Sequence, residues 1–178
     1  MARIAHRQHH VPDCWALSLD EADNQPILIK STREYSVELH DFCAQLGHAP
    51  PILAYEILPG GRRAIAMEFI SLAALITRSL GLATHNQRWM AELLKLVEAF
   101  HGKDLVHGDL RDVNIICDND GKMMLIDFDW GGMDGEVFYL SFNLNTELLE
   151  GRKSSTLKIS KDDDIRVLKR TLEKLNVN

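Results

Sequence analysis

The chain has 178 residues, 46% of them hydrophobic, which is enough to build one core in a single compact domain. Its 26 acidic against 20 basic side chains give a formal charge of −6 at pH 7, which argues against nucleic acid or an anionic membrane as a partner. No apolar stretch reaches the ~18 to 20 residues of a spanning helix. The first residues also lack the apolar segment of a secretory signal, so we expect a cytoplasmic protein.

The first seventy residues read as short strands and one helix. We expect a hairpin from Trp15 to Lys30, and apolar residues at helical intervals predict a helix over Ser36–Leu46. Two further strands, Ile52–Ile57 and Ala64–Phe69, flank a Pro-Gly-Gly turn. This half therefore predicts a mixed sheet covered by a single helix.

The second half reads as mainly helical. We expect a short helix over Leu72–Leu80, a longer one from about Asn86 to His101, and a terminal amphipathic helix over Asp162–Leu175. Between the last two lie short strands, Val113–Cys117 and Met123–Ile126. The change of pattern near residue 70 indicates two lobes of one domain.

The three cysteines of the chain carry no sign of a disulfide frame or a zinc site. They are widely spaced, odd in number and form no CxxC pair: Cys14, Cys43 and Cys117. We therefore expect reduced, buried thiols and no structural metal.

Polar residues concentrate in the loop from His107 to Asn114 and again at Asp127. Asn114 lies five residues after Asp109, and an apolar run ends at Asp127, thirteen residues after Asn114. This spacing, with the hairpin between and a helix ending just upstream, resembles the catalytic and metal loops of the protein-kinase-like superfamily.

The resemblance assigns a role to each polar residue of these loops. Asp109 would orient the acceptor hydroxyl or take its proton, and Arg111 would neutralise charge beside the transferring phosphate. Asn114 and Asp127 would offer oxygen ligands to Mg²⁺, while His107 would support the loop. Taken singly, each Asp or Asn could instead be an ordinary turn residue.

The same resemblance extends to the first lobe. In the superfamily a lysine at a strand end holds the nucleotide phosphates and pairs with a glutamate of the following helix. Lys30 and Glu38 occupy those places, and Glu34 is the rival partner.

The strand that ends near Phe69 would lead into the hinge between the lobes. Met67 would then line the back of the nucleotide pocket, and the backbone of Glu68 to Ile70 would meet the adenine. An ordinary strand end explains these residues equally well.

Three departures from the superfamily pattern bear on function. No glycine precedes Gly47, so the glycine loop over the phosphates is missing, although residues 1 to 14 could form a lid charged by Arg3, Arg7 or His10. Asp129 stands where protein kinases usually have glycine, and it could bind a second ion, cap the turn or repel the phosphates. The chain ends 51 residues after Asp127 and lacks an Ala-Pro-Glu tripeptide, which makes protein substrates less favoured.

The histidines near the N-terminus are assigned to a tail rather than to a metal site. No carboxylate or cysteine lies at ligand spacing with them: His6, His9 and His10.

The resemblance thus implies an α+β, bilobal protein-kinase-like fold in one domain over 1–178. A small antiparallel-sheet lobe (11–70) would precede a reduced, mainly helical lobe (71–178). The finer resemblance is to small fungal kinase-like proteins and to aminoglycoside and choline phosphotransferases, through the segment Trp130 to Glu136.

The function that this resemblance implies is an ATP- and Mg²⁺-dependent phosphotransferase acting on a hydroxyl, with a small molecule favoured over a protein as acceptor. The alternatives are a pseudokinase serving as a binding or regulatory module and an atypical protein Ser/Thr kinase. An open sheet edge could also favour a homodimer.

Overall fold

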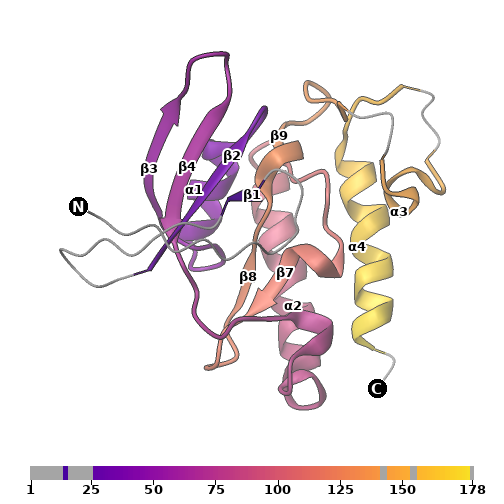
Figure 1. The fold of residues 1–178 in the computed structure, drawn as a ribbon. Helices are drawn as coiled ribbons and strands as arrows, with labels where there is room; N and C mark the ends of the chain where they lie inside the picture. Colours follow the sequence, from indigo (N-terminus) through magenta and orange to yellow (C-terminus); the bar gives the residue numbers. More distant parts are fainter. Residues whose placement is uncertain (1–13, 16–25, 141–143, 153–155, 177–178) are drawn as a thin grey trace.

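The computed structural model describes residues 14–15, 26–140, 144–152 and 156–176, and it has two lobes (Figure 1). The sheet lobe lies on one side of the molecule, and helices α2 (Leu82–His101) and α4 (Lys161–Leu175) form the other. Within the expected first hairpin, the residues between Trp15 and Pro26 lie outside the described residues. So do the N-terminal basic residues considered for a lid or a tail: Arg3, His6, Arg7, His9 and His10.

The sheet lobe contains four strands in the order β1-β2-β4-β3, and every pair is antiparallel, not mixed as the strand pattern had indicated. Their bounds are β1 (Cys14–Trp15), β2 (Ile27–Thr32), β3 (Ile52–Ile57) and β4 (Arg63–Glu68). The turn between β3 and β4 contains Gly60 and Gly61, both with positive φ, which glycine adopts without steric cost. The antiparallel sheet implied by the superfamily resemblance is thus confirmed.

Helix α1 (Val37–Gln45) follows β2 and is shorter than the predicted span by one residue at each end. The Ser36 side chain caps it by accepting from the Leu39 N–H. The Ser36 N–H donates to the carbonyl of Phe128 at 3.0 Å, so the start of α1 is tied to the second lobe. Leu39 and Cys43 are fully buried in the core that the two lobes share.

The prediction of a short helix over Leu72–Leu80 is wrong. The segment forms the two-residue strand β5 (Ala74–Leu75) and a single 3₁₀ turn, η1 (Ile76–Arg78). Leu72 has a φ of 60° and is largely exposed, and Leu80 is fully exposed, so the apolar residues do not line one helical face. Strand β5 instead pairs with β7 (Ile115–Cys117).

Helix α2 is the centre of the second lobe. It begins four residues before the predicted start and ends at His101 as predicted, with Gly102 following. One stripe of the helix is almost completely buried, as the spacing of its apolar residues predicts: Trp89, Leu93, Leu96, Val97 and Phe100.

The polar loops lie between short strands. Strand β6 (Leu105–Val106) pairs with β9 (Gly132–Met133), and β7 pairs with β8 (Met123–Leu125). The 3₁₀ turns η2 (Asp112–Asn114) and η3 (Phe128–Trp130) sit at the ends of these strands. Two pieces of chain that carry the candidate chemistry are thereby brought next to each other.

The last part of the chain contains α3 (Thr146–Leu149) and α4, which lie side by side in Figure 1. Ser160 and Asp163 form a capping box at the start of α4. Arg166 and Arg170 donate to carbonyl oxygens of Glu147 and Glu150, which satisfies the end of α3. The terminal amphipathic helix is thus confirmed to within one residue.

Strand β3 is the outer strand of the sheet and exposes Leu53, Tyr55 and Ile57. An exposed strand edge with apolar side chains can pair with another chain, and the homodimer expected from the sequence stays a prediction. None of the helices in the described ranges has the length and apolar character required to cross a membrane.

Candidate active site

The loop after β6 carries an ion pair between the Asp109 carboxylate and the Arg111 guanidinium. Asp109 is almost fully buried, and Arg111 donates to both of its carboxylate oxygens, at 2.5 and 2.6 Å. A bidentate pair of this kind fixes the orientation of the carboxylate. The hydrogen bonds to Asp109, which outweigh the cost of burial, raise the pKa of Arg111 above its ordinary value.

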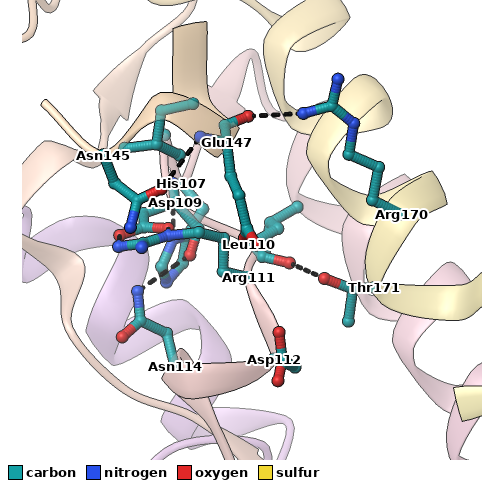
Figure 2. A network of polar contacts seen from close by, with 12 residues as sticks. His107, Asp109, Leu110, Arg111, Asp112, Asn114, Asn145, Glu147, Arg170 and Thr171 are labelled. Atoms are coloured by element: carbon teal, nitrogen blue, oxygen red, sulfur yellow. Dashed lines mark hydrogen bonds and ion pairs between the residues drawn. The ribbon is translucent and has the colours of Figure 1, made fainter. Parts of the chain in front are cut away.

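Asn114 is attached to the same loop. Its amide nitrogen donates to the backbone carbonyl of Asp109 at 3.1 Å (Figure 2), which leaves the side-chain oxygen directed away from that bond. The Asn114 carbonyl in turn accepts from the N–H of Ile126, the residue before Asp127. Asn114 therefore connects the acid-bearing loop to the loop expected to bind metal.

The backbone of the Asp109 loop is held from α4 by a residue that the sequence analysis did not assign. Asp164 is fully buried, and its two oxygens accept from the N–H groups of His107 and Gly108, each at 2.8 Å. One of these oxygens also lies 3.0 Å from Nε2 of His101. A charged acceptor that satisfies two buried N–H groups is a strong anchor.

Two further groups hold the same backbone. The Tyr139 hydroxyl donates to the carbonyl of Gly108 at 2.6 Å. The Thr171 hydroxyl donates to the carbonyl of Leu110 at 2.8 Å, as Figure 2 shows. Burial raises the pKa of Tyr139, so it remains a neutral donor. Asp164 and Thr171 share the buried stripe of α4 with Leu168 and Leu175. Both are polar residues within an otherwise apolar stripe, and this pattern in the sequence could have identified them as functional candidates.

His107 supports the loop, as expected. It is completely buried, its Nδ1 accepts from the N–H of Asp109 at 3.3 Å, and its ring lies 5.1 Å from that of Phe128. Gly108, the next residue, has a φ of 81°, and a Cβ there would lie 2.7 Å from Cβ of Trp130. Only glycine fits between the two loops at this point.

The second loop brings two carboxylates onto Lys30. The Lys30 ammonium lies 2.5 Å from Oδ1 of Asp127 and 2.6 Å from Oδ1 of Asp129. Asp127 has φ and ψ of 66°, a left-handed conformation that is rare outside glycine and asparagine or aspartate. The hydroxyl of Thr32 donates to Oδ2 of Asp129 at 3.0 Å.

The charges in this cluster perturb one another. Burial alone would lower the pKa of Lys30, but Asp127 and Asp129 outweigh it and raise that pKa. Burial raises the pKa of Asp129 to about 6, opposed by Lys30 and reinforced by Asp127. Burial acts in the same direction on Asp127, but Lys30 prevails and lowers its pKa. Asp127 is thus the more stable anion of the two.

The predicted pairing of Lys30 with Glu38 is wrong for this structure. Helix α1 begins only at Val37, and Glu38 lies exposed in its first turn. The rival partner, Glu34, pairs instead with Arg63 at 2.9 Å. The groups of this region that approach the Lys30 cluster are uncharged: the ammonium lies 5.7 Å from the centre of the Tyr35 ring, and His40 stacks on Phe128 at 4.5 Å.

The residues expected to meet the nucleotide base lie at the end of β4. Met67 is buried opposite Leu28 of β2, and Glu68 is exposed. The N–H of Glu68 donates to the carbonyl of Pro51, whereas the N–H of Ile70 donates to no oxygen among the described residues. Within the described ranges, the N–H of Ile70 is thus a backbone donor that a ligand could use.

The donor set fits a magnesium ion. Asn114 and Asp127 offer oxygen atoms only, and the Asp127 side chain is 40% exposed. Within the described ranges no cluster of three or more His, Cys, Asp or Glu side chains could enclose a metal. One or two protein oxygens completed by phosphates and water is the arrangement that Mg²⁺ usually takes.

Comparison with known proteins agrees with this geometry. Residues 58–130, less than half of the chain, match the family model described as the RIO domain. A curated relative, the probable serine/threonine-protein kinase mkcF of Dictyostelium discoideum, is 31% identical over 129 residues. The alignment covers 64% of this chain and 18% of mkcF, so the chain spans about a fifth of that relative's length.

A solved structure matches almost the whole chain. The Cydia pomonella granulovirus kinase PK-1 superposes with a TM-score of 0.77 at 12% identity, covering 97% of this chain and 67% of the viral one. The fold is therefore that of a small bilobal kinase. Together with the sequence matches, it supports the resemblance to the protein-kinase-like superfamily. The matches support a kinase-type phosphotransferase in general, and the finer branch stays a prediction.

Proposed function

We propose that the protein binds ATP with Mg²⁺ and transfers the γ-phosphoryl group to a hydroxyl of a small molecule. The observation that carries this proposal is the arrangement of the Asp109 loop, with its buried carboxylate fixed by Arg111 and by the backbone anchors from α4. Phosphoryl transfer depends mainly on positioning and on neutralisation of charge, which such a preorganised loop supplies.

The proposal gives each residue of the site a defined task. Asp109 accepts or orients the proton of the acceptor hydroxyl, and Arg111 holds Asp109 in place while facing the phosphate that is transferred. Asn114 and Asp127 hold Mg²⁺, which neutralises the phosphate oxygens when bound. The fixed geometry of the loop removes the need to order these groups during the reaction.

The nucleotide is held from the sheet lobe. Lys30 supplies the positive charge for the phosphates, and the backbone of Glu68 to Ile70, beside Met67, receives the base. The N–H of Ile70, which has no acceptor in the part of the chain that the structure describes, supports this assignment.

The acceptor is proposed to be a small molecule because the sequence contains no Ala-Pro-Glu tripeptide to support a peptide-binding segment. The relative mkcF is described as a probable serine/threonine-protein kinase, which makes transfer to a protein the competing proposal. Phosphorylation of generic proteins or of the chain itself would favour that competitor.

The nucleotide site is tested by thermal unfolding with ATP plus Mg²⁺, ATP plus EDTA, and no ligand. At about 100 times Kd, binding adds about 2.7 kcal/mol, which raises the Tm by roughly 5 to 11 °C for a chain of this size. We expect that rise only with Mg²⁺, and we expect Asp127→Asn to remove it. Transfer itself is tested by Asp109→Asn, which should abolish ATP consumption while the Tm shift remains.

A binding module without turnover is the second candidate. It is favoured by the contact of Lys30 with Asp127, because the carboxylate proposed for the metal is occupied by a cation. A Tm shift with ATP and Mg²⁺, but no consumption of ATP in the presence of any acceptor tested, would support this alternative.

A further inference from the structure

Lys30 needs an anchor that remains after the metal has bound. In the structure its ammonium contacts Asp127 and Asp129, and Asp127 is also the residue proposed to hold Mg²⁺. If Asp127 turns to the metal, only a second carboxylate can keep the ammonium in position. Glu38 is exposed and Glu34 pairs with Arg63, so helix α1 and the turn before it offer none in this structure.

Asp129 has the geometry for this task. Its side chain is 23% exposed against 40% for Asp127, so it is the more enclosed of the two. Its Oδ2 accepts from the Thr32 hydroxyl, and this bond directs Oδ1 toward Lys30. Oδ1 is buried and meets no hydrogen-bond criterion among the described residues, so its contact with the Lys30 ammonium at 2.6 Å is an ion pair.

The sheet explains why these groups meet. Lys30 and Thr32 are two residues apart on β2, so their side chains project from the same face of the strand, and both are buried. The 3₁₀ turn η3 sets Asp129 two residues beyond Asp127, within reach of both strand residues. A glycine at position 129 could make neither contact.

We propose that Asp129 is the positioning residue for Lys30. From its place in the loop after β8, it holds the Lys30 ammonium, a task that the resemblance assigns to a glutamate in α1. This inference rests on the proposed nucleotide-binding function and adds to it the way in which Lys30 is held. When Asp127 binds the metal, Asp129 and Thr32 keep the ammonium directed at the phosphates.

The test compares Asp129→Asn, which keeps the shape of the side chain, with Glu38→Gln as a matched control on the exposed helix position. The first measurement needs no nucleotide: acetylation of Lys30 by a limiting amount of acetic anhydride, followed by mass spectrometry. We expect Lys30 of Asp129→Asn to react at least about threefold faster than wild type, and Lys30 of Glu38→Gln to react at the wild-type rate.

The second measurement is the Kd for ATP with Mg²⁺, and the KM where turnover is found. We expect Asp129→Asn to weaken ATP binding about tenfold or more, with Glu38→Gln within about twofold of wild type. Asp129→Glu should recover part of the loss because it restores a carboxylate. Near-wild-type Tm values for the variants without ligand confirm that they are folded.

The outcomes separate this inference from the proposed function. Equal acetylation rates in wild type and Asp129→Asn, or a larger effect of Glu38→Gln on ATP binding, would overturn the role of Asp129. Absence of ATP binding by wild type would refute the proposed function instead, while the acetylation rates would still show whether Asp129 or Glu38 restrains Lys30.

Discussion

The loop that carries Asp109 is fixed through its backbone, whereas Lys30 on the sheet lobe is fixed through the end of its side chain. Asp164, Tyr139 and Thr171 bind four backbone groups between His107 and Leu110. Lys30 instead meets two carboxylates from the other lobe. Backbone anchors make the first region rigid, while ion pairs at the end of a long side chain can exchange partners when a ligand arrives. The difference suits the proposed site, in which Asp109 is preorganised and Lys30 can release Asp127 to the metal while Asp129 keeps the ammonium in place.

The largest effect is expected from breaking the backbone anchor. Asp164→Asn removes a charged acceptor of two buried N–H groups and should lower the free energy of unfolding by about 3 to 5 kcal/mol. The Tm should then fall by roughly 6 to 20 °C. The control is Asp162→Asn, an exposed residue of the same helix turn, which should change the Tm little. Equal effects of the two substitutions would contradict the anchoring role.

A pH series tests the contact between α1 and the turn η3, where His40 stacks on Phe128. Burial lowers the pKa of His40 from 6.5 to about 4, and the ring lies between Tyr35 and Pro50 oxygens and stacks on Phe128. The unfolded chain therefore binds more protons between these pH values, so stability should fall as the pH drops from about 6.5 to 4. The expected loss is about 3 kcal/mol, measured by denaturant unfolding.

His40→Asn should flatten this pH dependence. His85→Gln, at a half-buried histidine on α2, should retain it. An unchanged slope in His40→Asn would assign the pH dependence to other groups.

The pairing of Arg111 with Asp109 is tested by Arg111→Lys, which keeps the charge but loses the two-pronged geometry. We expect kcat to fall roughly 10- to 100-fold, the effect of one charge-assisted hydrogen bond, with the KM for ATP unchanged. A change in KM for ATP with kcat intact would mean that Arg111 binds the nucleotide and does not position Asp109.

The smallest effect is expected at Thr32. Thr32→Val keeps the shape of the side chain but removes the bond to Asp129, which should cost about 1 kcal/mol, or a Tm decrease of roughly 2 to 4 °C. Thr32→Ser retains the hydroxyl and should lose less. The order of the two variants in thermal unfolding, with Val lower than Ser, distinguishes the hydrogen bond from packing of the methyl group.

Features that depend on local spacing could be predicted from the order of the residues alone. The apolar stripes of α2 and α4 follow from a 3.6-residue period. The two polar loops were found from the fixed intervals between Asp109, Asn114 and Asp127. These signals are contained in short stretches of chain, so they can be read without knowing what packs against them.

The pairing of residues that lie far apart in the chain could not be predicted in this way. The sequence order suggested Glu38 for Lys30, but the short α1 leaves Glu38 in solvent, and the partners come 97 residues later in the case of Asp127. Asp164 acts on a loop 57 residues before it, and the segment after Leu72 becomes a strand because β7 offers an edge to pair with. Ion pairs and strand pairing depend on which elements the fold brings together, and no local period encodes that choice.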